Sequence, residues 1–365
     1  MRLPTYDEVA RVPEQLDIYD APLDESFFVV GPPGSGKTVL AIHRARIMAS
    51  AGIKVVFVTY NRMLRRLGAL LAEGRIDAKT MHKFVGDHYY KHMQRCAPKL
   101  EGKPYSNDWD AIFGDLRRLG IGADATHAII DEGQDLPKLF FRYVREFVAT
   151  NVTVFADEEQ ALTDERSTLT DIKSGAGLGD PILLSGNHRN SPEVARVAWH
   201  FHDGEIPVPD VHRGSSGELP SLVLYGSLEE ATKRIANWYK GRGGSLGVVV
   251  DRNDTGLAIL ARLRRRLEGH RVDFYSNKQR NEDTINLLEP GITVLNEKSI
   301  KGQEFDAVFI MEIGRFLARA TDVGRRVMYM LCSRARDNLV FMHEGDRLPS
   351  VLLSQLPGPD LMERK

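Results

Sequence analysis

The residues best suited to chemistry form a glycine-rich segment near the start of the chain, Gly31-Pro32-Pro33-Gly34-Ser35-Gly36-Lys37-Thr38. This segment fits the phosphate-binding pattern G-x-x-x-x-G-K-[ST] in full. Its glycines let backbone N–H groups turn towards phosphate oxygens, and the N-terminus of a following helix adds partial positive charge. The pattern predicts that Lys37 reaches the β- and γ-phosphates of a nucleoside triphosphate and that the Thr38 hydroxyl holds Mg²⁺.

A second group of chemically active residues ends an apolar run, Ala128-Ile129-Ile130-Asp131-Glu132. Carboxylates at the end of a buried strand supply a metal ligand and a base in phosphate-loop ATPases. Asp131 is expected to hold Mg²⁺, and Glu132 is expected to polarise the attacking water. The two segments together predict Mg²⁺-dependent ATP hydrolysis.

Short apolar runs that alternate with helical patterns are expected to position these residues. Residues Phe27–Val30 precede the glycine-rich segment as a buried strand, and residues Val39 to Met48 follow it as a helix. Strands interleaved with helices predict an α/β fold with parallel sheets covered on both faces. The other expected strands are Val55–Thr59, Ala128–Asp131, Val152–Phe155, Ile182–Leu184, Leu222–Tyr225, Gly247–Val250, Val272–Phe274, Thr293–Leu295, Ala307–Met311 and Asn338–Met342.

The expected strands fall into two sets, which predict two α/β domains, residues 1–186 and 187–365. Residues 86–126 are charged and aromatic with little strand pattern, so they are expected to form a small helical insertion in the first domain. Residues 207–220 are rich in proline, glycine and serine and are expected to form a loop within the second domain.

Composition limits the classes of partner. The chain has 365 residues and a net charge of −1, so any nucleic-acid surface must be a local groove rather than a global field. Its two cysteines, Cys96 and Cys332, lie far apart and show no metal-binding spacing. We expect a cytoplasmic protein with no membrane-spanning segment, because two scattered thiols fit a reducing compartment and no long apolar run is present.

The segment Asp131-Glu132-Gly133-Gln134-Asp135 closely resembles the DExQD box of UvrD/Rep-like superfamily 1 DNA helicases. Other segments resemble the remaining motifs of that family, in the family's order and over nearly the whole chain. The ordered set is far more specific than any single member. The segments are Val58–Arg62 (motif Ia), Thr80–Phe84 (motif Ib), Phe155–Gln160 (motif III), Asn187–Asn190 (motif IV), Lys298–Asp306 (motif V) and Leu331–Arg336 (motif VI).

The resemblance implies two RecA-like domains of the P-loop NTPase type, with the ATP site in the cleft between them. By the same resemblance, Gln160 would sense the γ-phosphate, Arg189 would contact it, and Arg334 would be the arginine finger. Further nucleotide contacts would come from Gln15, which would read adenine, and from motif V through Gly302 and Glu304. Single-stranded nucleic acid would be contacted by Thr59, Tyr60, Asn61, Thr80, His82 and Phe84.

Some positions depart from the family pattern. The space available for accessory domains is short, so the chain is expected to be a near-minimal motor whose second accessory domain is reduced or absent. A base-stacking tryptophan is missing after motif III, and His188 stands where the family usually has an adenine-stacking tyrosine. Hydrolysis of a triphosphate is therefore more firmly implied than strict ATP selectivity or duplex unwinding by this chain alone.

The leading functional hypothesis is an ATP-dependent translocase or helicase on single-stranded nucleic acid. The resemblance implies DNA as the substrate and 3′-to-5′ movement. A second hypothesis is a regulatory ATPase subunit that recruits or gates a protein partner, such as a nuclease, in DNA repair or anti-phage defence. RNA stays open as a substrate, because no residue can be named that reads the 2′-hydroxyl.

Overall fold

The computed structural model describes residues 5–60, 62–72, 75–157, 167–202, 208–276, 289–319 and 321–365. The chain divides into two compact units. The first unit is built from residues 36–185 with the N-terminal segment up to residue 32, and the second is built from residues 186–365 with the three loop residues 33–35.

The first unit contains a sheet of six parallel strands in the spatial order β3-β2-β4-β5-β1-β6. Val30 at the end of β1 pairs with Ala156 at the end of β5, and Ile130 at the end of β4 pairs with Val154. The segments that follow these three strands therefore leave the sheet at one edge. The strands are β1 (Phe27–Val30), β2 (Val55–Thr59), β3 (Ala78–Thr80), β4 (Ala125–Ile130), β5 (Ala149–Ala156) and β6 (Ile182–Leu183).

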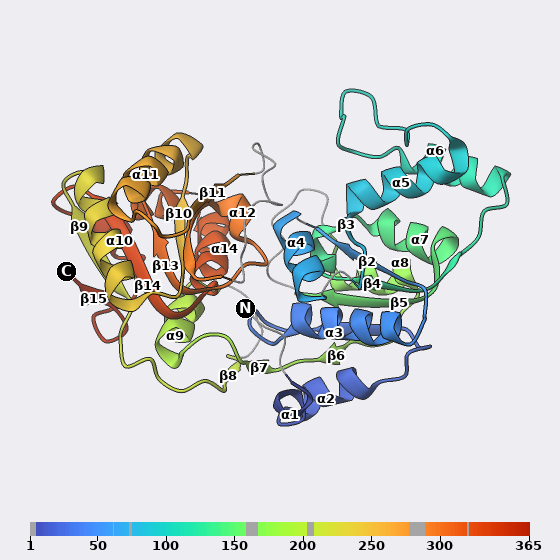
Figure 1. Cartoon of the computed structure of the whole chain (residues 1–365), viewed down its shortest axis with the longest axis horizontal. Coiled ribbons are helices and arrows are strands. Elements are labelled where there is room, and N and C mark those ends of the chain that lie inside the picture. Colours follow the sequence, from blue (N-terminus) through green and yellow to red (C-terminus); the bar gives the residue numbers. More distant parts are fainter. Residues whose placement is uncertain are drawn as a thin grey trace. The chain divides into compact units, whose positions relative to one another are not determined.

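Helices cover both faces of this sheet, as parallel strands require. Figure 1 shows α3 on one face and α7 and α8 on the other. Aromatic side chains of α5, α6 and α7 form much of the apolar core on the second face. The helices are α1 (Tyr6–Val9), α2 (Pro13–Asp20), α3 (Lys37–Ser50), α4 (Arg62–Leu71), α5 (Met81–Met93), α6 (Trp109–Arg118), α7 (Lys138–Phe147) and α8 (Leu169–Ala176), with a 3₁₀ turn at Gly133–Asp135.

The second unit contains a sheet of seven parallel strands in the order β11-β12-β10-β13-β14-β9-β15. A separate parallel pair, β7 and β8, joins Gly186 to Asp210 and Asn187 to Val211. The strands are β7 (Gly186–Asn187), β8 (Asp210–Val211), β9 (Ser221–Tyr225), β10 (Ser245–Val250), β11 (Val272–Tyr275), β12 (Gly291–Asn296), β13 (Phe305–Ile310), β14 (Ala335–Glu344) and β15 (Glu363–Arg364).

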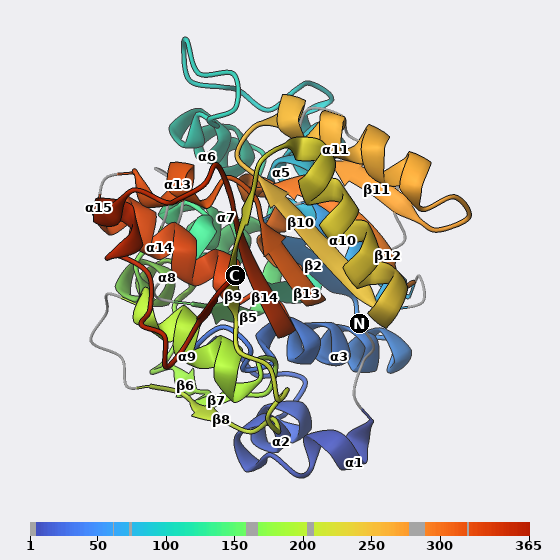
Figure 2. The ribbon, with the colours of Figure 1, turned by 90° about the vertical axis from the view of Figure 1, so that its left-hand side faces the viewer.

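The large sheet of the second unit also carries helices on its faces. Figure 2 shows α10 and α11 lying over the strands, and their apolar side chains form one core with β10, β12 and β13. On α11, Leu263 is buried, whereas Arg264 and Arg265 are exposed. The helices are α9 (Pro192–His200), α10 (Leu228–Arg242), α11 (Asn253–Arg266), α12 (Glu297–Ile300), α13 (Ile313–Leu317), α14 (Thr321–Cys332) and α15 (Ser350–Leu353).

The parallel α/β architecture expected from the sequence is confirmed, with shifts at element ends. The strand expected at Ala128–Asp131 is Ala125–Ile130, so Asp131 lies just beyond it. The loop expected at 207–220 contains β8, a two-residue strand too short to give an apolar pattern. None of the helices in the described part of the chain is long and apolar enough to cross a bilayer.

Candidate active site

The glycine-rich segment connects β1 to α3 and turns sharply at two glycines. Gly34 has a φ of 85° and Gly36 a φ of 93°, a backbone region that strongly favours glycine. A Cβ atom on Gly36 would lie only 2.8 Å from Nε2 of Gln15, so α2 brings the buried Gln15 side chain against this loop. The predicted adenine-reading residue therefore lies next to the predicted phosphate loop.

Lys37, the first residue of α3, has its ammonium group inside the loop. The Nζ atom donates hydrogen bonds to the carbonyl oxygens of Gly31 at 2.5 Å and Pro32 at 2.8 Å. Oδ2 of Asp157, which follows β5, lies 3.6 Å from the same ammonium, and both side chains are largely buried. The geometry fixes a cation at the N-terminus of a helix, which is where phosphate oxygens bind.

Asp131 and Thr38, the two predicted Mg²⁺ ligands, lie together. The Asp131 side chain hydrogen-bonds the Thr38 hydroxyl, while burial and the neighbouring Glu132 carboxylate raise the pKa of Asp131 well above its usual range. Its Oδ2 atom is buried and has no hydrogen-bond partner among the described residues. A buried oxygen without a partner beside a hydroxyl fits an oxygen-binding cation such as Mg²⁺.

Glu132 is held in an uncommon backbone conformation with a φ of 58°. Its Oε2 atom accepts a hydrogen bond from Nε2 of Gln134 at 2.5 Å. Oε1 of the same glutamine accepts a hydrogen bond from the backbone N–H of Asp157 at 3.0 Å. Gln134 and Asp157 were part of the motif matches without a predicted role, and the structure shows that they connect the expected base to the end of β5.

A second cluster lies within the second unit. Nε of Arg189 donates to Oε2 of Glu304 at 2.6 Å, with only 16% and 18% of the two side chains exposed. Arg334 is buried, its Nε donates to the carbonyl of Met330 at 3.1 Å, and its own carbonyl accepts from the N–H of Phe305 at 3.0 Å. The structure thus brings the predicted residues of motifs IV, V and VI together.

Two further predicted site residues need separate mention. Gly302, in the turn that leads to Glu304, has a φ of 74°, so its conformation favours glycine whatever its contact with nucleotide. Gln160 lies outside the described residues, as does Asn61.

The residues predicted to contact nucleic acid differ in how far their side chains are exposed to solvent. Thr59 is fully buried, and Phe84 is 7% exposed and stacks on His88 in the core, so neither side chain offers surface to a strand in this structure, and their contact with nucleic acid stays a prediction. Apolar packing beneath α5 accounts for the burial of Phe84. By contrast, Tyr60 is 36% exposed and His82 is exposed.

The exposed members lie at one edge of the first sheet. Thr59 at the end of β2 pairs in register with Thr80 at the end of β3. Tyr60 and His82 follow these two positions closely, so adjacent strands deliver both rings to the same edge. Thr80 itself is half-buried at the N-cap position of α5.

A buried arginine fixes the segment that carries Gln15. The Arg44 side chain on α3 is fully buried and donates to the carbonyl oxygens of Ile18 at 2.8 Å, Ala21 at 3.0 Å and Pro22 at 2.8 Å. Burial lowers the pKa of Arg44 to about 10, so the guanidinium remains charged at neutral pH.

The substitution Arg44→Met is expected to lower the free energy of unfolding of the first unit by about 3 kcal/mol or more, because it leaves buried carbonyls without donors. Arg118→Met is the matched control, since the Arg118 side chain is 75% exposed and its partner Asp115 keeps its hydrogen bonds from Tyr89 and Arg95. Urea unfolding followed by tryptophan fluorescence measures both variants. Equal unfolding midpoints for the two variants would contradict the prediction.

A comparison with known protein families supports the fold of the first unit. The AAA domain family matches residues 17–165, a range that contains the phosphate loop, the carboxylates and Asp157. The P-loop nucleotide-binding fold predicted for this part of the chain is thereby confirmed. A comparison with curated proteins finds no match.

Two solved structures are similar to this chain at low identity. The C-terminal domain of a possible DNA helicase from Lactobacillus plantarum aligns over 49% of this chain and 99% of that chain, with 20% identity and a TM-score of 0.37. The Arterivirus non-structural protein 10 helicase aligns over 94% of this chain and 65% of that chain, with 13% identity and a TM-score of 0.41. This chain therefore spans less than two thirds of the viral protein.

Proposed function

We propose that the chain is an ATP-driven translocase on single-stranded DNA that moves 3′ to 5′, as its resemblance to UvrD/Rep-like helicases implies. The observation that carries the proposal is the cluster of Arg189, Glu304 and Arg334 in the second unit. A simple nucleotide-binding switch needs only the phosphate loop and carboxylates. A second parallel sheet with clustered motif arginines is what a two-domain motor requires.

Hydrolysis follows from the groups at the edge of the first sheet. Lys37 binds the β- and γ-phosphate oxygens, and Thr38 and Asp131 would hold Mg²⁺. Bound there, Mg²⁺ would neutralise charge that develops on the phosphates. Glu132 orients the attacking water and accepts its proton, while Gln134 keeps that carboxylate in place.

We propose that Arg189 and Arg334 contact the γ-phosphate and stabilise the negative charge of the transition state. Release of that phosphate removes the group that both arginines contact. ATP turnover can then drive a conformational change in each cycle.

The surface that binds single-stranded DNA is proposed to include the residues that follow the carboxyl ends of β2 and β3. Tyr60 and His82 present aromatic rings there, and stacking of a base on an aromatic ring is worth about 1–3 kcal/mol. Such stacking does not depend on the identity of the base, because every base has a π-face, and this suits a motor that must step along DNA of any sequence.

The test is steady-state ATP hydrolysis with and without single-stranded DNA, with RNA in parallel and Lys37→Ala as the blank. We expect DNA to stimulate turnover severalfold. The Tyr60→Ala variant should need a higher DNA concentration for half-maximal stimulation, because one stacking contact is lost. Tyr105→Ala is a matched control, since this tyrosine is 76% exposed in the loop between α5 and α6.

The possible outcomes separate the candidate functions. Stimulation by DNA but not by RNA supports the DNA translocase, and the reverse result assigns an RNA substrate. Low turnover that neither nucleic acid changes would contradict the translocase. That result would favour the regulatory ATPase that gates a protein partner such as a nuclease.

A further inference from the structure

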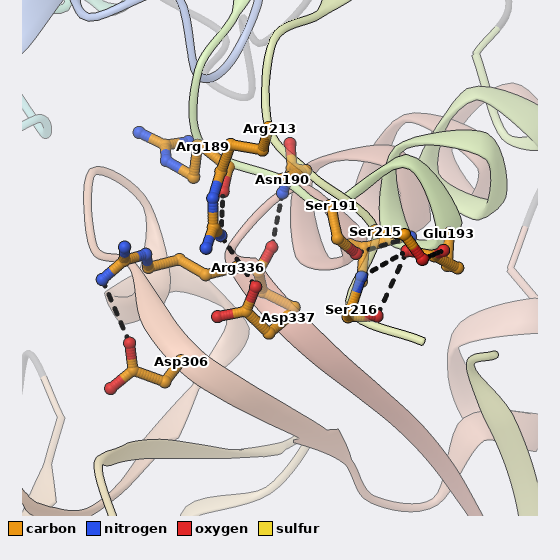
Figure 3. A network of polar contacts seen from close by, with 12 residues as sticks. Arg189, Asn190, Ser191, Glu193, Arg213, Ser215, Ser216, Asp306, Arg336 and Asp337 are labelled. Atoms are coloured by element: carbon orange, nitrogen blue, oxygen red, sulfur yellow. Dashed lines mark hydrogen bonds and ion pairs between the residues drawn. The ribbon is translucent and has the colours of Figure 1, made fainter. Parts of the chain in front are cut away.

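Residues 210–216 of the second unit run alongside motif IV. They begin with β8, which pairs with β7, and the N–H of His212 donates to the carbonyl of Asn187 at 3.0 Å. Figure 3 shows Arg213, Ser215 and Ser216 from this segment beside Arg189, Asn190 and Glu193. None of these residues was assigned a role by the sequence pattern except Arg189.

Arg213 contacts both the motif IV backbone and the motif VI strand. Its Nη1 atom donates to the carbonyl oxygen of Arg189 at 2.8 Å and forms an ion pair with Oδ1 of Asp337 on β14 at 2.9 Å. The Arg213 and Asp337 side chains are 26% and 33% exposed. One guanidinium therefore ties residue 189 to β14, the strand that follows Arg334 and contains Arg336.

The far end of the segment is held by Glu193 on α9. Its carboxylate accepts hydrogen bonds from the Ser215 hydroxyl and, at 3.1 Å each, from the hydroxyl and the backbone N–H of Ser216. Burial opposes ionisation of Glu193, but these hydrogen bonds outweigh it and lower the pKa of its carboxyl to about 2. The segment is thus fixed on both sides of Arg213.

Motif IV is also fixed to β14 from its other side. Nδ2 of Asn190 donates to the carbonyls of Ser333, at 3.1 Å, and of Ala335. The N–H of Ser191 donates to the carbonyl of Arg336 at 2.7 Å, and the Arg336 guanidinium pairs with Asp306 at 3.1 Å. Arg213 adds a contact to residue 189 itself, because its guanidinium donates a hydrogen bond to the Arg189 carbonyl oxygen.

We propose that Arg213 is a positioning residue for ATP hydrolysis: it fixes the backbone of Arg189 so that the Arg189 guanidinium meets the γ-phosphate in productive geometry. The inference rests on the proposed function, because it assumes that Arg189 acts on ATP. A catalytic group must be held to within a fraction of an ångström, and a displacement of 1 Å can cost about a hundredfold in rate.

The first experiment measures kcat and KM for ATP hydrolysis in Arg213→Ala. We expect kcat to fall by about tenfold to a hundredfold while the KM for ATP changes by less than about threefold. Arg213→Lys keeps a charged donor and should recover part of the lost kcat. Arg234→Ala is the control, because Arg234 forms a surface ion pair with Glu230 within α10 and should leave kcat unchanged.

A double-mutant cycle with Arg189→Ala tests the route of the effect. If Arg213 acts through Arg189, then Arg213→Ala lowers kcat in the parent protein and has little further effect in the Arg189→Ala background. A merely structural role would lower kcat by the same factor in both backgrounds, and that result would overturn the inference. Normal kcat in Arg213→Ala would overturn it as well.

Two controls keep the result interpretable. Melting temperatures show whether Arg213→Ala folds; if it does not, Asp337→Asn replaces it, since this change removes the partner carboxylate and should lower kcat in the same direction. Absence of the ATP hydrolysis on which the inference rests is seen separately, because the unaltered protein would then hydrolyse no more ATP than Lys37→Ala. That result would end the inference together with the proposed function.

Discussion

The Lys37→Ala protein is expected to hydrolyse ATP at least about a hundredfold to a thousandfold more slowly than the unaltered protein. The lost ammonium group lies between the carbonyls of Gly31 and Pro32 at the start of α3, 3.6 Å from Asp157. Without it, the charge on the β- and γ-phosphates is neutralised only in part, and phosphate affinity falls as well. Phosphate release with Mg²⁺-ATP gives the rate, and a fluorescent ATP analogue gives the affinity.

The matched control for this prediction is Lys54→Ala. Lys54 precedes β2 in the same unit, and its side chain is 60% exposed and paired with Asp124 at 3.3 Å. Its removal deletes the same charge from the unit without touching the phosphate loop. Unchanged turnover in Lys37→Ala would show that the phosphate loop does not bind the hydrolysed nucleotide, and the ATPase assignment would then be wrong.

Much of the first unit's site could be predicted from the sequence because its chemistry is local. The phosphate loop needs particular glycines, a lysine and a hydroxyl in one continuous segment. Buried parallel strands read as continuous apolar runs, so the strand before the loop and the strand before Asp131 could both be recognised. Apolar runs alternating with helical patterns likewise predicted the parallel α/β fold, which the structure confirms.

Contacts between distant segments could not be predicted in this way. Arg44 and Arg213 bind backbone carbonyls, which every residue carries, so nothing in the sequence marks their partners. Exposure also depends on tertiary packing. Thr59 and Phe84 match nucleic-acid motifs by residue type, but the fold turns both side chains into the core of the first unit.

The second large effect is expected for Arg334→Ala, which should lower kcat by about a thousandfold while nucleotide affinity stays close to that of the unaltered protein. Arg334 lies in the turn between α14 and β14 and belongs to the cluster that holds Arg189 and Glu304. An arginine that acts only on transition-state charge contributes to kcat and little to ground-state binding. Arg334→Lys should recover little, because a lysine lacks the planar fork that contacts two oxygens.

Folding has to be separated from catalysis here, because Arg334 is buried. Arg326→Ala provides the control: Arg326 lies on α14, and its Nε donates to the carbonyl four residues earlier at 3.3 Å, as Nε of Arg334 does to Met330 at 3.1 Å. If both variants lose melting temperature but only Arg334→Ala loses kcat, then Arg334 has a role in turnover beyond its role in folding. Normal kcat in a folded Arg334→Ala protein would exclude the arginine-finger role and would leave Arg189 as the remaining candidate in the second unit.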